Sequence, residues 1–102
     1  MYIVVMEGRS FDWDPVKAQQ NRSKHGVSFE EAQTAFYDEN ARLIYDPDHS
    51  QDEDRFLLLG LSASMRLVVV IHTYRAGETV IRIISARKAT KQEQRQYATY
   101  LG

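Results

Sequence analysis

The chain has 102 residues, which is enough for one domain with a single core but too few for two domains. It contains no cysteine, so disulfide frameworks, thiolate zinc sites and cysteine nucleophiles are excluded, and a reducing cytoplasm suits it. The formal net charge of −1 gives no overall attraction to nucleic acid, so any site for an anion must be local.

The first segment, MYIVVMEG, is a short apolar run that lacks the basic start of a signal peptide and the length of a membrane span. We therefore expect a cytoplasmic protein in which residues 1–10 form an extra strand or a tail. The following SFDWD extends that strand or stands as a short extended piece. Asp14 then caps a helix that has Pro15 in its first turn and ends at Gly26, a residue suited to the left-handed position after a helix.

A second helix is predicted directly after the first. Ser28 and Glu31 have the spacing of a capping box, in which each side chain bonds to the backbone N–H of the other residue. The apolar residues that follow recur at helical spacing and define one buried face, made of Phe29, Ala32, Ala35 and Phe36. The pattern therefore predicts two short helices near the N-terminus, joined by a tight turn.

From residue 41 onward the pattern becomes that of β-strands. Four apolar segments are separated by polar or glycine-bearing turns, at 41–46, 55–62, 66–74 and 79–87. They predict an antiparallel sheet of about four strands in a meander. Thr90 and Glu93 form a second capping box, which opens a C-terminal helix over 91–101. Helices and strands in this order belong to the α+β class.

Two histidines are candidates for proton transfer. His72 lies near the end of its strand, on the same face as Val68 and Val70 by the two-residue period. It is either an acid or base near neutral pH or a strand-end histidine bonded to a neighbour. Lys24 and His25 end the first helix, where a cation complements the helix dipole, so a capping role explains them as well as substrate binding does.

Three cations surround the last strand. Arg82 stands among isoleucines inside that strand, so its guanidinium must find a carboxylate, a phosphate or a route to water. A salt bridge to the acidic segment that precedes Arg55 and a substrate role explain it equally well. Arg87 and Lys88 follow the strand, close to a helix N-terminus that attracts anions, so they predict a phosphate site or a solvated loop.

The acidic segment itself, residues 46–54, lacks the acid spacing, central glycine and terminal glutamate of a calcium loop, so we expect a solvated turn and no metal site. Glu53 is the exception, because it directly precedes the next strand, where it pairs with Arg82 or acts as a base. The chain has no glycine-rich phosphate loop, serine elbow or HExxH helix, which excludes hydrolases of those types, and we expect no cofactor.

These residue types suit one metal-free reaction. When the 2′-hydroxyl of RNA attacks the neighbouring phosphorus, a base takes its proton, cations stabilise the phosphate and an acid protonates the leaving 5′-oxygen. The candidate cations are Arg55, Arg82, Arg87 and Lys88, and the candidate proton carriers are His25, His72 and Glu53. Tyr74 or Trp13 could stack an unpaired base. The residues alone thus predict an anion-binding α+β domain.

Three segments together resemble a known family. FDWDPVKAQQNRSKHGVSFEEA resembles the opening signature of that family, EDRFLLLG a middle segment, and RIISARKATKQEQRQY its ending, all in the same order along the chain. The family is the BrnT toxins of type II toxin–antitoxin systems. The resemblance implies one domain over residues 1–102 with a RelE-like fold, and a metal-independent ribonuclease that arrests translation. The implied partners are RNA and a BrnA-type antitoxin, whose ribbon-helix-helix domain provides the only contact with DNA.

The resemblance also groups the candidate residues. Arg82, Ser85 and Arg87 stand in the RIISAR block, Lys24 and His25 in the KHG block, and Glu53 and Arg55 in the E-x-R block. We therefore hypothesise two sets, a catalytic one of Arg82, Arg87, Glu53 and His72, and an RNA-binding one of Lys24, His25, Arg55, Lys88 and Ser85. The alternative function is a non-catalytic module, whose cationic strand ends dock a DNA-binding partner and so take part in autoregulation of transcription.

Overall fold

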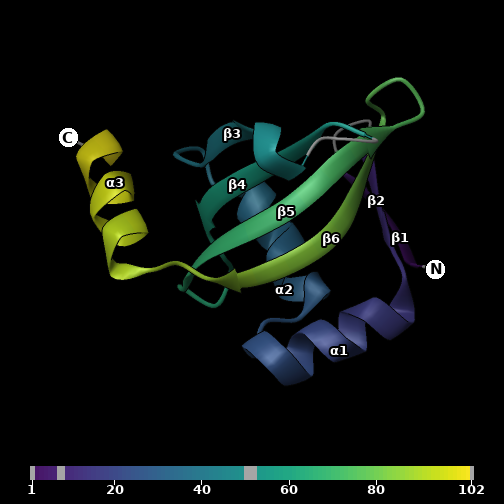
Figure 1. Ribbon diagram of the computed structural model, residues 1–102, viewed down its shortest axis with the longest axis horizontal. Helices are drawn as coiled ribbons and strands as arrows, with labels where there is room; N and C mark the ends of the chain where they lie inside the picture. The colour runs from purple at the N-terminus through teal and green to yellow at the C-terminus, as the bar shows by residue number, and fades with distance from the viewer. Residues whose placement is uncertain (1, 7–8, 50–52, 102) are drawn as a thin grey trace.

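The computed structural model describes residues 2–6, 9–49 and 53–101 of the chain (Figure 1). The elements in chain order are β1 (Tyr2–Met6), β2 (Arg9–Trp13), α1 (Pro15–His25), α2 (Phe29–Thr34), the 3-10 turn η1 (Ala35–Tyr37), β3 (Arg42–Asp46), the 3-10 turn η2 (Pro47–His49), β4 (Arg55–Leu61), β5 (Leu67–Arg75), β6 (Val80–Lys88) and α3 (Lys91–Leu101). The predicted α+β class is confirmed.

The described strands form one six-stranded sheet in the order β1-β2-β6-β5-β4-β3. Strands β3 to β6 are the predicted antiparallel meander. Strand β2 lies beside β6 in parallel, with Phe11 aligned with Ile81, so the sheet is mixed. The prediction of a sheet of about four strands, all antiparallel, was therefore wrong in two respects. The sheet has two more strands, and the pairing of β2 with β6 is parallel. The two predicted helices also do not stand at the N-terminus, because the hairpin β1–β2 precedes them.

Helix α1 begins and ends, and helix α2 begins, where the capping residues predict, whereas Ala35 and Phe36 of the predicted helical face lie in η1. Asp14 Oδ1 accepts a hydrogen bond of 2.9 Å from the backbone of the first turn of α1, and Gly26 takes the left-handed conformation with φ of 71°. Ser28 accepts a bond of 3.0 Å from the N–H of Glu31. The Glu31 carboxylate accepts hydrogen bonds from Arg66, with 2.9 Å between Arg66 Nε and Glu31 Oε2. The capping box is therefore half formed.

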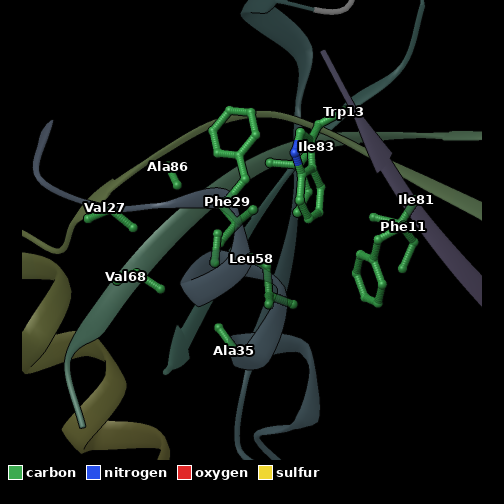
Figure 2. Close-up of a cluster of buried hydrophobic side chains, with 12 residues drawn as sticks. Phe11, Trp13, Val27, Phe29, Ala35, Leu58, Val68, Ile81, Ile83 and Ala86 are labelled. Atoms are coloured by element: carbon green, nitrogen blue, oxygen red, sulfur yellow. The ribbon is translucent and has the colours of Figure 1, made fainter. Parts of the chain in front are cut away.

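The main core lies between the sheet and the helices α1 and α2 (Figure 2). Its largest fully buried apolar side chains are those of Trp13, Phe11, Phe29, Ile81 and Val27. Side chains along β5 and β6 alternate, so the neighbours in sequence of the core residues point to the opposite face of the sheet. We call that opposite face, which α1 and α2 leave uncovered, the open face.

Helix α3 covers one end of the open face. Its Tyr97 packs with Leu59 and Val69 of the sheet and donates a hydrogen bond of 2.6 Å to Asp38 Oδ2. Burial and this bond raise the pKa of Tyr97 to about 12. At the end of the helix, the ring of Tyr100 lies under the guanidinium of Arg42, 4.1 Å from its carbon. The helix thus closes one end of the open face, and the other end carries polar side chains.

Candidate functional site

A row of five polar residues crosses the open face. Register pairs join Asp12 of β2 to Arg82 of β6, Arg82 to Thr73 of β5, and Asp46 of β3 to Arg55 of β4. Extending the pairing of Phe56 with His72 by one residue places Arg55 beside Thr73. We call Asp12, Arg82, Thr73, Arg55 and Asp46 the polar row. Adjacent strands lie about 4.8 Å apart, so the backbones of Arg82 and Arg55 are roughly 10 Å apart across Thr73.

Arg82 lies between Asp12 and Thr73 in this row. Its two sequence neighbours, Ile81 and Ile83, are 1% and 2% exposed in the core, so its own side chain points to the open face. That side chain is 22% exposed, and its Nη1 lies 3.4 Å from Oδ1 of Asp12. Asp12 lies outside the acidic segment from which the sequence predicted a partner. The pair leaves a partly desolvated cation facing the open side of the sheet.

Glu53 lies close to two arginines at the same end of the sheet. Its Oε2 is 3.3 Å from Arg75 Nη2, and its Oε1 is 4.0 Å from Arg55 Nη2. A hollow of about 320 Å³ opens here, with Glu53, Thr73 and Arg75 among its lining residues. The Glu53 side chain is 38% exposed, more than the 14% of Asp12 in the polar row, so a ligand in the hollow can reach this carboxylate. The predicted Glu53 and Arg55 therefore meet at one end of the polar row.

His72 lies in the core, on the face opposite the polar row. The side chain is fully buried, with Nδ1 at 3.0 Å from the carbonyl oxygen of Val70 and the ring packed edge-on against Phe36 at 4.9 Å between centroids. Burial lowers the pKa of His72 to about 4, so the ring is neutral at pH 7. This location contradicts the predicted catalytic role, because a ligand on the open face cannot reach the ring. Trp13 is likewise buried and cannot stack a base.

Arg87 links β6 to α3 and does not lie in a solvated loop. Its Nη1 and Nη2 donate to the two carboxylate oxygens of Glu93 at 2.8 and 3.0 Å. The same carboxylate accepts a bond from the N–H of Thr90, whose hydroxyl accepts from the N–H of Glu93, so the second predicted capping box is fully formed. Arg87 therefore has a structural partner, whereas Lys88 beside it is exposed.

Acid is expected to weaken this link. The Arg87 guanidinium holds the pKa of Glu93 at about 2, below its ordinary 4.5, so the unfolded chain binds this proton more readily than the folded chain. The stabilisation is complete above about pH 4.5 and is lost as the pH falls towards 2. We expect Glu93→Gln to lower the free energy of unfolding by about 1–2 kcal/mol at neutral pH. Urea titrations of both proteins at several pH values should show this difference shrinking in acid; a constant difference would contradict it.

Three of the predicted RNA-binding residues come together elsewhere, in a groove between α1 and the edge of β6. The groove measures about 330 Å³ and is lined by Lys17, Gln20, Asn21, Lys24, His25, Ile84 and Ser85. The predicted residues thus form two groups, one along the polar row and one in this α1–β6 groove. The sequence did not single out Asn21, which is 8% exposed and bonds to the backbone of β6.

Within 2–6, 9–49 and 53–101, no three histidine, aspartate or glutamate side chains gather closely enough to hold a metal ion. No described helix combines the length and the apolar character of a membrane span.

Residues 13–93 match the family model of the ribonuclease toxin BrnT of type II toxin–antitoxin systems. Among solved structures, the fold is similar to the 1.1 Å crystal structure of the Brucella abortus ribonuclease toxin BrnT, with a TM-score of 0.58 and 25% sequence identity. The match covers 79% of this chain and 96% of the Brucella chain. No curated protein matches the chain.

Proposed function

Since this chain belongs to the BrnT family of ribonuclease toxins of type II toxin–antitoxin systems, we propose that it cleaves RNA internally, without a metal ion, by attack of a 2′-hydroxyl on the adjacent phosphorus. The family resemblance read from the sequence is confirmed. The observation that carries the proposal is the polar row, in which the partly exposed Arg82 and Arg55 flank Thr73, whose own side chain is buried and donates to the carbonyl oxygen of Asp54. Kinship with RelE-like toxins stays a prediction.

The proposed roles follow from position and charge. Arg82 and Arg55 bind the scissile phosphate and stabilise the added negative charge as the 2′-oxygen bonds to phosphorus. Glu53, exposed and within 4.0 Å of Arg55, accepts the proton of the 2′-hydroxyl. The bond from phosphorus to the 5′-oxygen then breaks, and that oxygen takes a proton from water, which reaches the open face. Arg87 positions the start of α3 through Glu93 and does not contact the phosphate.

The α1–β6 groove binds a second part of the RNA. Lys24 and His25 at the end of α1 contact phosphates that flank the scissile one, and Ser85 lines the same groove. Lys88 is exposed at the end of β6, where it lines a separate hollow with Arg66 and Gln94 and supplies a further cation. Because the net charge of the chain is −1, these local cations supply the attraction, and binding should weaken as salt rises.

In the cell, we propose that cleavage arrests translation in the cytoplasm and that a BrnA-type antitoxin neutralises the toxin. The half-buried Leu57 and Ile71 lie on the open face beside the polar row, which supports the docking of a partner over the site. The ribbon-helix-helix domain of the antitoxin would then hold the complex on DNA. The same apolar residues favour the alternative function, a docking module without turnover.

Analysis of the products separates the two functions. The purified chain is incubated in EDTA with single-stranded RNA labelled at its 5′ end, alone and with ribosomes, and the new termini are identified by mass spectrometry. We expect 2′,3′-cyclic phosphate and 5′-hydroxyl ends, because the attacking nucleophile belongs to the RNA. Ends bearing a 5′-phosphate would contradict the mechanism. The absence of cleavage under both conditions would favour the docking module.

A further inference from the structure

Strand β3 forms one edge of the sheet, and its outer side has no partner among the strands that the structure describes (Figure 1). An edge strand offers unpaired backbone groups, and soluble proteins usually protect such edges with charges, prolines or covering segments. Here the centre of the strand is apolar instead: Leu43 is 53% exposed, Ile44 41% and Tyr45 47%. Three consecutive exposed apolar side chains on a free edge indicate an interaction surface.

The sequence of this strand, RLIYD, is complementary to itself when two copies run antiparallel. Pairing centred on Ile44 places Ile44 opposite Ile44, Leu43 opposite Tyr45, and Arg42 opposite Asp46. We propose that β3 is a homodimer interface, at which a second copy of this chain adds its own β3 and continues the sheet. The opposite charges at the two ends fix the register, and the apolar centre is buried.

The faces of the sheet fit this arrangement. Arg42, Ile44 and Asp46 point to the open face, since they oppose Leu59, Leu57 and Arg55 of β4. A twofold axis perpendicular to the sheet makes the edge strands antiparallel and keeps both open faces on the same side. Each Asp46 then lies between Arg55 of its own chain and Arg42 of the second copy, so the alternation of charge along the polar row continues across the interface.

Two features favour a second copy over a different partner. The pairing of opposite charges and of apolar side chains requires the sequence RLIYD on both strands of the interface. A second copy of this chain supplies that sequence. The formal net charge of −1 adds little repulsion between two copies. The contact is small, because it involves one short strand per chain, so we expect a weak dimer that forms at high protein concentration.

A charge-exchange experiment tests the interface. We compare the wild type, Arg42→Asp, Asp46→Arg and the double variant by sedimentation equilibrium from low to high micromolar concentration, with circular dichroism to verify each fold. Each single variant places like charges opposite each other, so self-association should weaken by at least about tenfold. The double variant restores opposite charges and should dimerise again. An equimolar mixture of the two single variants should form a heterodimer.

Two apolar substitutions complete the design. Ile44→Lys places two ammonium groups together at the twofold axis and should leave a monomer. Val16→Lys removes a more exposed apolar side chain, 61% exposed, from α1 and should not change the dimer. A wild type that stays monomeric at high concentration would overturn the proposal. So would a dimer that persists in Ile44→Lys, or two folded single variants that fail to associate on mixing.

Discussion

Replacing Arg82 with alanine is expected to reduce RNA cleavage by at least about 10²-fold, because this change removes a preorganised cation from the proposed phosphate site. The side chain is 22% exposed, so its charge acts in a partly desolvated setting in which an electrostatic interaction is stronger than in water. Arg82→Lys keeps the charge but loses the planar fork of donors, so it should recover only part of the activity. The measurement is the initial rate of cleavage of labelled RNA in EDTA.

Two comparisons make the Arg82 result specific. Arg95→Ala removes an exposed arginine from α3, away from the polar row, and should cleave RNA like the wild type. His72→Phe keeps an aromatic ring in the packing against Phe36 and Phe56, and should retain activity close to that of the wild type if the histidine only fills the core. Equal loss of activity in Arg82→Ala and His72→Phe, with both proteins folded, would contradict the proposed assignment of roles.

Local signals explain most of what the sequence predicted correctly. Capping residues act within one helical turn. The helix ends at Asp14, Gly26 and Thr90 could therefore be predicted from a few neighbouring residues. The alternation of residues likewise placed His72 on the face of Val68 and Val70. In the structure, this face of β5 lies in the core. The alternation that placed His72 beside Val68 and Val70 was therefore evidence against a catalytic role for His72.

Contacts between segments that are distant in the sequence could not be predicted from local sequence patterns. Nothing near Phe11 indicates that β2 pairs with β6 in parallel, and nothing near Asp12 indicates that it meets Arg82. The sequence suggested an anion for Arg82 and could not name the carboxylate. Glu93 shows the same limit, since its capping bond to Thr90 was predicted, whereas its pairing with Arg87 depends on the angle at which α3 leaves the sheet.

Asn21 has one local signal in the sequence: asparagine is a poor helix former, so its place inside a predicted helix indicates a specific structural role. The structure shows this role. Its Nδ2 donates to the carbonyl oxygens of Val27 and Ala86 at 2.9 and 2.8 Å, and its Oδ1 accepts from the N–H of Ala86 at 3.1 Å and from the Ser85 hydroxyl at 3.3 Å. One amide thus binds both backbone groups of Ala86 and joins α1 to β6.

Asn21→Ala is therefore expected to lower the free energy of unfolding by about 3 kcal/mol, because it leaves the buried N–H and C=O of Ala86 without this partner. Asn21→Asp should cost at least as much, since one carboxylate oxygen would then face two carbonyl oxygens. Urea titration at neutral pH measures both variants, with Gln19→Ala on the exposed side of α1 as the control. A loss below about 1 kcal/mol in Asn21→Ala would mean that water replaces the amide. Ordered water would then join α1 to β6 at this wall of the proposed RNA groove.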